Sequence, residues 1–230
     1  MRRSIVILLF LSLSLSAVTC LAQKQEYVGQ YDAYFAFAYM TTPNMNLDQR
    51  GWQAQFGYNY RRWLALGFDT SYFGGNSSVT VPQLNTATVA KLAPIFPYLP
   101  PGYTVYEPYH ANTYTITGGT QFNYRGFKWV TLFVHPDIGA MHQSVQVNPV
   151  DPIQAGIAKS LLGPNMKTSE WVPFFGVGGG VDVNVSKHVG LRFHADWVRT
   201  AFFSDVLKNP QHTWRLSASP TFRFGKNVPK

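Results

Sequence analysis

The chain has 230 residues, of which 46% are apolar, 16% aromatic and only 13% charged, and its formal net charge is +8. A typical soluble domain has about twice this share of charged residues. The composition excludes a disordered chain, a coiled coil and a collagen-like repeat. A single cysteine excludes a disulfide scaffold and a cysteine-ligated zinc site.

The N-terminus has the pattern of an export signal. Two arginines follow Met1, residues 4–18 are almost entirely apolar or serine, and small residues at Cys20 and Ala22 precede a polar residue. We therefore predict a signal peptide over residues 1–22 and one domain over residues 23–230. An anchoring helix and a lipidated Cys20 are the alternatives. Beyond this segment, no apolar run approaches the ~20 residues that a membrane-spanning helix needs.

Eight segments of the remaining chain alternate between apolar and polar residues with the two-residue period of a β-strand. In chain order they are Tyr27–Met40, Gly51–Tyr60, Trp63–Phe73, Thr113–Tyr124, Val130–Met141, Trp171–Val185, a run from Val189 through Trp197, and a run from Thr213 to Phe224. Three connections are very short, whereas those at 41–50, 74–112, 142–170 and 204–212 are longer. Short turns at one end, long loops at the other and an even number of strands of about ten residues are typical of an outer-membrane barrel.

The composition of the polar face indicates which side meets lipid. A soluble barrel would turn its apolar face inward and show water a face rich in lysine and glutamate. Here the polar face is mainly Gly, Ser, Thr, Asn and Gln, which suit a narrow, packed interior. We therefore predict an all-β fold, an eight-stranded antiparallel up-and-down transmembrane β-barrel with short periplasmic turns and two large extracellular loops. The expected membrane-interface aromatics are Trp52, Trp171 and Trp214 near the long loops and Tyr60, Tyr124, Phe222 and Phe224 near the short turns.

The excess of positive charge gathers at the short turns, which carry Arg61, Arg62, Arg125, Lys128 and Lys187, while the long loops are balanced. This pattern predicts a basic ring that meets anionic lipid headgroups of the outer membrane, or water. It does not indicate binding to nucleic acid.

Charged residues on the polar face should lie inside the barrel. Counted from the turn end, Asp32, Asp69, His135, Arg192 and His194 fall at similar heights, and Asp137, Asp196 and Arg215 fall one layer higher; Asp182 and Arg223 complete the set. Because eight strands enclose a space just wide enough for side chains, we expect a paired polar network that plugs the barrel. The alternatives are a narrow pore or proton path, and acid–base catalysis by a histidine–aspartate pair. We assign no catalytic residue, metal ligand or cofactor.

Two other motifs carry weaker signals. His142 and Ser144 leave the fifth strand towards a long loop, where a lipid-modifying hydrolase would place such residues, but no acid accompanies them at a fixed spacing. The glycine-rich run 176–180 lies inside a strand and opens no helix, so it is not a phosphate-binding loop. Its glycines are expected to make room for bulky interior neighbours such as Arg192 and Phe133.

The two largest loops are predicted to contain short helices. Asn85 is a candidate N-cap for a helix through Leu92, and Asp151 followed by proline starts a second helix, which a Gly-Pro pair ends. One face of the second helix carries Ile153, Ile157 and Leu161. This stripe either packs on the other loop as a cap or binds a partner, so loops 74–112 and 142–170 are the candidate sites for an extracellular ligand.

Several segments together resemble small OmpA-type outer-membrane β-barrels, also called porin-family proteins: Gly51-Trp52, Leu66–Asp69, Gly178–Asp182, Val189–Phe193 and the terminal run Arg215–Gly225. The resemblance implies an eight-stranded barrel in the outer membrane of a Gram-negative cell, inserted by the barrel-assembly machinery, with a mostly structural, adhesive or unknown role. We predict a structural or surface-interaction protein that is not an enzyme. Two departures stand out. No peptidoglycan-binding domain follows the last strand, and the chain continues past Phe224 to Lys230.

Overall fold

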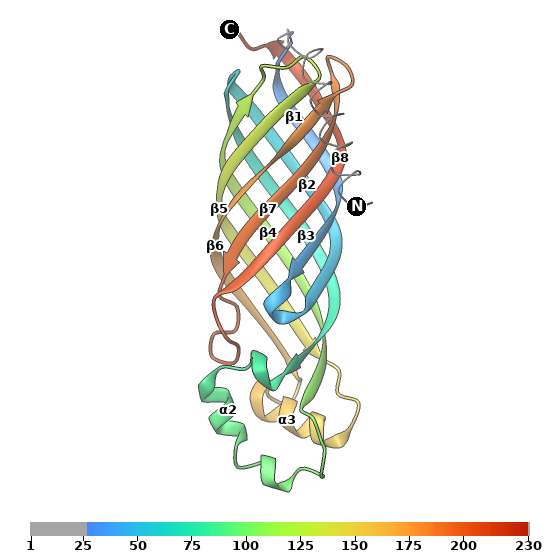
Figure 1. Ribbon diagram of the computed structural model, residues 1–230, viewed down its shortest axis with the longest axis vertical. Coiled ribbons are helices and arrows are strands. Elements are labelled where there is room, and N and C mark those ends of the chain that lie inside the picture. Colours follow the sequence, from blue (N-terminus) through green and yellow to red (C-terminus); the bar gives the residue numbers. More distant parts are fainter. Residues whose placement is uncertain (1–26, 230) are drawn as a thin grey trace, which may run out of the picture.

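The computed structural model describes residues 27–229, so the predicted signal peptide lies outside the described residues. Eight antiparallel strands form a closed barrel in which each strand pairs with its neighbours in the chain and the eighth pairs back to the first (Figure 1). The strands are β1 Gly29–Thr42, β2 Leu47–Arg61, β3 Leu64–Thr80, β4 Tyr106–Tyr124, β5 Val130–Val147, β6 Lys167–Asn184, β7 Val189–Thr200 and β8 Gln211–Asn227. The predicted fold class is confirmed.

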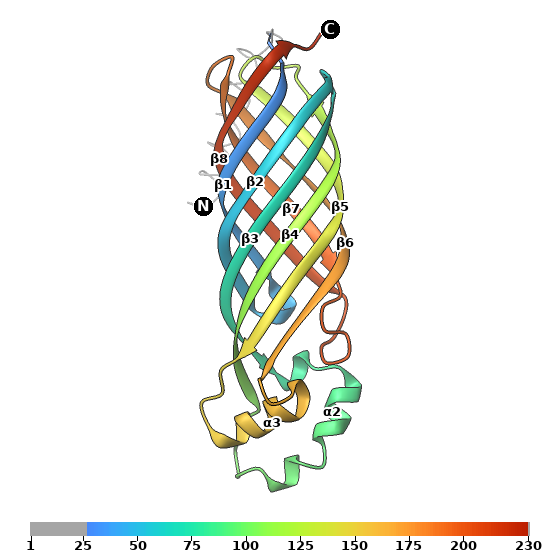
Figure 2. The same cartoon turned by 180° about the vertical axis from the view of Figure 1, so that it is seen from behind.

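The start of β1, the end of β8 and the short turns lie at one end of the barrel, and the helical loops lie at the other (Figure 1). The view from behind shows the same separation, with α2 and α3 together beyond the ends of the strands (Figure 2). The helical elements are η1 Pro43–Met45, η2 Val81–Gln83, α2 Thr86–Leu92, η3 Phe96–Tyr98 and α3 Pro152–Leu162. No helix within residues 27–229 is long and apolar enough to cross a membrane.

The strands run further towards the helical loops than the alternation predicted. Residues 74–80 pair with 106–112, and residues 142–146 pair with 167–171. The predicted loops 74–112 and 142–170 therefore shrink to 81–105 and 148–166, and the predicted connection 41–50 shrinks to 43–46. The prediction failed because the outward positions of these extensions are polar. Asn76 and His110, for example, face each other across β3 and β4 with Oδ1 and Nδ1 2.7 Å apart.

The barrel has the opposite polarity to a soluble protein. Its outward-facing strand positions are apolar, and side chains such as Phe35 and Ile138 are 67% and 72% exposed. Its inward-facing positions are polar, and the guanidinium groups of Arg192 and Arg215 are almost completely buried. A contiguous apolar belt of this size on a monomeric surface requires an apolar environment.

The two long loops pack on each other beyond the loop end of the barrel. Asn85 caps α2 by accepting a hydrogen bond from the amide of Thr88 at 2.7 Å, and Asp151 caps α3 by accepting one from the amide of Gln154 at 2.8 Å. Both predicted helices are confirmed. Residues of both loops share one apolar cluster, whose buried members are Leu84, Leu92, Val105 and Ile157. The apolar stripe of α3 thus packs against the other loop as a cap. We call residues 81–105 with 148–166 the loop cap.

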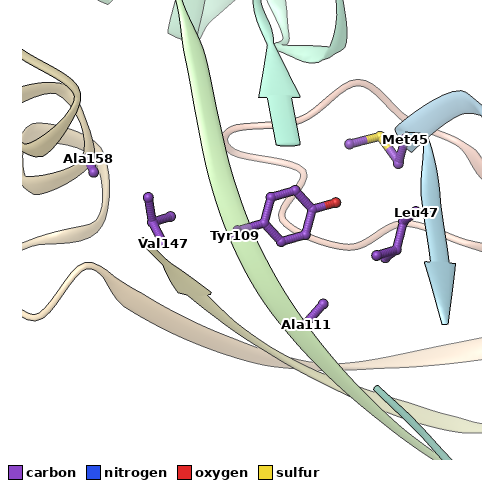
Figure 3. Packing of buried hydrophobic residues seen from close by; sticks show 6 residues of the cluster. All are labelled: Met45, Leu47, Tyr109, Ala111, Val147 and Ala158. Carbon is purple, nitrogen blue, oxygen red and sulfur yellow. The ribbon is translucent and has the colours of Figure 1, made fainter. Parts of the chain in front are cut away.

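An apolar layer lies between the loop cap and the interior of the barrel. Its buried members come from the β1–β2 connection, from β2, β4 and β5, and from α3, and Tyr109 lies in the middle of them in Figure 3: Met45, Leu47, Tyr109, Ala111, Val147 and Ala158. A small cavity of about 80 Å³ adjoins this layer and is lined mainly by apolar side chains, including Met40, Met141 and Phe202.

Candidate functional site

The interior below the apolar layer is the densest group of charged residues in the described chain. The alternation of each strand turns every second residue inward. This geometry buries five aspartates and three arginines on the inner face, together with two histidines: Asp32, Asp69, Asp137, Asp182, Asp196, Arg192, Arg215, Arg223, His135 and His194. These side chains form two layers with different partners.

The lower layer, towards the short turns, is built around Arg192. Its Nε and Nη2 donate to the two carboxylate oxygens of Asp182 at 2.7 and 2.9 Å, and its Nη1 donates to Gln55 Oε1 at 2.8 Å. Arg223 donates to the same Asp182 at 3.0 Å, and Asp32 lies 3.5 Å from Arg192. A bidentate guanidinium–carboxylate pair gives both strength and a fixed orientation.

Aromatic rings complete the surroundings of Arg192. The guanidinium carbon lies 4.8 Å from the ring centroid of Phe133 and 5.3 Å from that of Tyr34. Such cation–π contacts contribute about 1–2 kcal/mol in a desolvated site. The lower layer is thus charge-balanced and packed from several sides.

The upper layer is built around Arg215. Its Nη2 donates to Asp196 Oδ2 at 2.8 Å, and its Nη1 lies 3.3 Å from Asp69 Oδ1. The other oxygen of Asp69 accepts a hydrogen bond from Gln53 Nε2 at 2.6 Å. Asp137 Oδ2 lies 3.9 Å from Arg215. One guanidinium therefore serves three carboxylates in this layer.

Two histidines lie beside these carboxylates. His135 Nε2 and His194 Nε2 are 2.6 Å apart, and both approach Asp196 Oδ1. The other ring nitrogens have partners as well, since His135 Nδ1 lies 2.9 Å from Asp137 Oδ2 and His194 Nδ1 lies 3.0 Å from the hydroxyl of Tyr34. We call His135, His194 and Asp196 the histidine–aspartate cluster.

The layers differ from the sequence-based expectation in two respects. Asp69, His135 and His194 were expected at the height of Arg192, but Asp69 contacts Arg215 and both histidines lie beside Asp196, because strands on opposite sides of a tilted barrel are offset in height. The glycines of β6 were expected to make room for Arg192 and Phe133. This is confirmed for Phe133, whose ring would lie 2.8 Å from a Cβ at Gly180, but not for Arg192, since a Cβ at Gly178 would collide with Asp196 and His135.

The basic ring is also smaller than predicted. Arg125 is buried, and its Nε and Nη2 donate to the carbonyl of Arg62 and to Asn59 Oδ1, both at 2.9 Å. Burial lowers the pKa of this guanidinium to about 10. Arg125 therefore closes the turn end of the barrel from within, whereas Arg61, beside Tyr60, stays at the outer surface.

The predicted interface aromatics lie on the outer surface. Trp171 and Trp214 are about half exposed near the loop end of the strands, where Trp52 stacks on Phe35. Towards the turn end, the exposed aromatics include Tyr60, Tyr124, Phe222 and Phe224, together with Trp63, Phe122 and Trp129. This is the arrangement that two membrane–water interfaces favour.

His142 and Ser144 do not lie in a loop. Both belong to β5, on its outward-facing side, and the ring of His142 packs against that of Trp171 with centroids 4.9 Å apart. The expected position at a loop rim was therefore wrong, because the β5–β6 pairing continues past both residues.

One buried charged residue next to the loop cap was not predicted from the sequence. Glu107, in the extension of β4 beyond the aromatic belt, is buried among apolar residues of both loops, and neither carboxylate oxygen has a hydrogen-bond partner among the described residues. Burial, and then the negative charge of Asp151, raise the pKa of Glu107 to about 7. Its alternation with Tyr109 and Ala111 could have revealed it, but this segment was predicted to be a loop.

Three further interior residues were also missed. Tyr34, Gln53 and Gln55 could have been found by extending the alternation inside β1 and β2.

No family model and no curated protein matches the chain. Solved structures do match it. Neisserial surface protein A is 13% identical and covers 84% of this chain and 96% of its own length with a TM-score of 0.53. The chain has the fold of the small outer-membrane β-barrels. A major outer membrane protein from Thermus thermophilus is 9% identical and covers 84% of this chain and 99% of its own length with a TM-score of 0.50.

Proposed function

We propose that this barrel is an integral outer-membrane protein with a closed interior and a surface-interaction role carried by the loop cap. The observation that carries the proposal is its reversed polarity, with exposed aromatic and aliphatic side chains outside and buried charges inside. Hydrocarbon is the environment in which both faces are satisfied. The names of the two structural neighbours, a surface protein and a major outer membrane protein, support this location.

A closed interior is supported by the packing of its charged side chains. Arg192 is held by Asp182, Gln55 and two aromatic rings, and Arg215 is held by carboxylates from other strands. Opening a pore would require several of these buried pairs to separate, and separating one such pair costs about 3–5 kcal/mol. The apolar layer adds a second obstruction above them. We therefore favour a structural or interaction role over transport of ions or small solutes.

The loop cap offers the surface for an extracellular ligand. Tyr98 in η3 is 88% exposed and Val150, just before α3, is 77% exposed, so apolar contact area is available at the tips of the cap. Exposed tyrosine is favoured in protein interfaces because it combines a large apolar area with a polar group. A binding role of this kind needs no catalytic residues, which agrees with the outward position of His142 and Ser144.

The membrane part of the proposal is tested by a matched pair of charge insertions. Ile138→Arg places a charge in the middle of β5 and should destabilise the barrel in lipid vesicles by about 2–4 kcal/mol. Val150→Arg places the same charge on an equally exposed residue of the loop cap and should change stability by less than about 0.5 kcal/mol. Denaturant unfolding in vesicles measures both. Equal, small effects would place β5 in water and end the proposal.

Conductance tests the closed interior. The purified protein in planar bilayers should show no steady ion current above the leak. A steady current in the unmodified protein that Arg192→Ala changes would favour the narrow-pore alternative instead. Heat-modifiable gel migration of the membrane fraction checks in both cases that the barrel is folded.

A further inference from the structure

The histidine–aspartate cluster brings three potential metal-ligand atoms to one point. His135 Nε2 and His194 Nε2 are 2.6 Å apart, and Asp196 Oδ1 lies 3.3 Å from the first and 2.7 Å from the second. Donor atoms about 2.1 Å from a tetrahedral metal ion are about 3.4 Å apart. The three atoms are therefore about 0.1 to 0.8 Å closer together than a tetrahedral shell requires, so an ion between them would spread them slightly.

The hydrogen bond between the two imidazole nitrogens leaves one carboxylate oxygen of the cluster without a well-directed donor in the described part of the chain. Asp196 Oδ1 is buried and accepts no well-directed hydrogen bond among the described residues, although two imidazole nitrogens lie close to it. The second oxygen of Asp196 is already used by Arg215. A buried carboxylate oxygen without a donor is costly unless a cation lies beside it.

The partners of the outer ring nitrogens orient both imidazoles towards the cluster. His135 Nδ1 faces the carboxylate of Asp137 at 2.9 Å, and His194 Nδ1 faces the hydroxyl of Tyr34 at 3.0 Å. A proton on each Nδ1 leaves both Nε2 lone pairs directed at the same space. Histidine ligands of metal ions are held in this manner by a second carboxylate or hydroxyl partner.

The balance of formal charges in the two layers also favours a cation at the histidine–aspartate cluster. In the lower layer, ion pairs join Arg192 and Arg223 to Asp32 and Asp182, so the charges of these pairs cancel, and the buried Arg125 adds one positive charge at the turn end. The upper layer contains only Arg215 against three carboxylates, so with neutral histidines it has a formal excess of two negative charges. These three carboxylates are Asp69, Asp137 and Asp196. A divalent cation between the histidines would cancel the excess where it arises.

A glycine leaves the space for the cluster. A Cβ at Gly178 would lie 2.8 Å from His135 Nε2 and would overlap Asp196 Oδ1. Gly178 pairs with His135 in β5 and with Asp196 in β7, so it lies between the strands that carry the ligands. Any other residue at this position would force the ligand atoms apart.

From this geometry we propose that His135, His194 and Asp196 bind one divalent transition-metal ion of the zinc class inside the barrel. Two imidazole nitrogens and one carboxylate oxygen are a donor set that zinc, cobalt and nickel accept. The ion cross-links β5 to β7, which are separated by β6, and therefore stabilises the closed barrel. Because the cluster is buried, the ion enters while the strands assemble.

Metal analysis of the full-length protein extracted from membranes in detergent without chelator tests the site. We expect about one zinc ion per folded chain, and at least a tenfold lower content in His135→Ala and in His194→Ala. His142→Ala is the matched control, because His142 lies on the outer surface of the same strand as His135; its metal content should equal that of the unmodified protein. Heat-modifiable migration selects the folded fraction of each variant.

A second measurement does not depend on the variants folding. The unmodified protein refolded in detergent with Co²⁺ should develop the visible absorption of a low-coordinate cobalt site, and it should unfold at a higher temperature than protein refolded with chelator. A folded, unmodified protein without metal, whose cobalt spectrum remains that of the aqueous ion, overturns the proposal. The imidazoles would then share a proton. Metal retained equally by the two histidine variants and the control would also overturn it.

Discussion

Glu107 should make the stability of the loop cap depend on pH. Its carboxyl is buried in the apolar contact between the two loops, with neither oxygen hydrogen-bonded within the described chain, and its pKa is raised from 4.5 to about 7 by burial and by Asp151. A folded-state pKa above the unfolded value means that the closed cap holds the proton more tightly than the open one. The contribution is fully present below about pH 4.5 and is lost as the pH rises through about 7.

The size of the effect follows from the two pKa values. The difference between 4.5 and about 7 corresponds to at most about 3 kcal/mol. Because the local opening of the loops exposes only part of this contact, we expect about 1–2 kcal/mol, which raises the open population about 5- to 30-fold. Glu107→Gln keeps the shape of the side chain but does not titrate, so it should remove this pH dependence.

Hydrogen exchange of amides in residues 81–105 and 148–166, compared at pH 5 and pH 8 after correction for intrinsic rates, measures the opening directly. The unmodified protein should exchange faster at pH 8, and Glu107→Gln should show equal corrected rates at both pH values. Asp205→Asn, which alters an exposed acid of the β7–β8 loop, is the matched control and should behave as the unmodified protein. Equal corrected rates in the unmodified protein at pH 5 and pH 8 would refute the reasoning.

Three further predictions test the interior, the cap and the orientation. Arg192→Met leaves Asp182 with one guanidinium partner and Asp32 without its ion pair, so denaturant unfolding should show a loss of about 3–5 kcal/mol; a loss below about 1 kcal/mol would mean that water reaches these carboxylates. Asp151→Ala removes the N-cap of α3 and should cost about 1 kcal/mol locally, seen as faster exchange in α3 but not in the strands. On intact cells, a membrane-impermeant amine reagent should label the exposed Lys91 and Lys159 and not Lys187; the reverse labelling would invert the barrel.

The strands of this protein were predictable from the sequence in the part of the barrel that faces lipid. Between the two aromatic belts, the outward position of each strand must be apolar, so alternation marks the strands clearly. Beyond the aromatic belt at the loop end, outward positions no longer need to be apolar. Polar outward residues such as Asn76 and His110 therefore continue the pairing of β3 with β4. Residues 74–80 and 106–112 therefore read as loop although they are strand.

The interior residues were predictable one by one, but their partners were not. Alternation alone places Asp69 and Arg215 on the inner face, because each is an even number of residues from an inward neighbour. Which arginine meets which aspartate depends on the tilt and stagger of eight strands, and no local pattern encodes it. The convergence of His135 with His194 was invisible for the same reason, since it requires β5 and β7 to be placed across β6.

The ring is completed by β8, which pairs with β1 on one side and β7 on the other. This strand also supplies Arg215 and Arg223, two of the three guanidinium groups among the paired inner charges. Without this strand, the carboxylates contributed by β1, β3, β5, β6 and β7 would have Arg192 as their main counter-charge. Closing the seam of the barrel and neutralising its inner carboxylates therefore depend on the same strand.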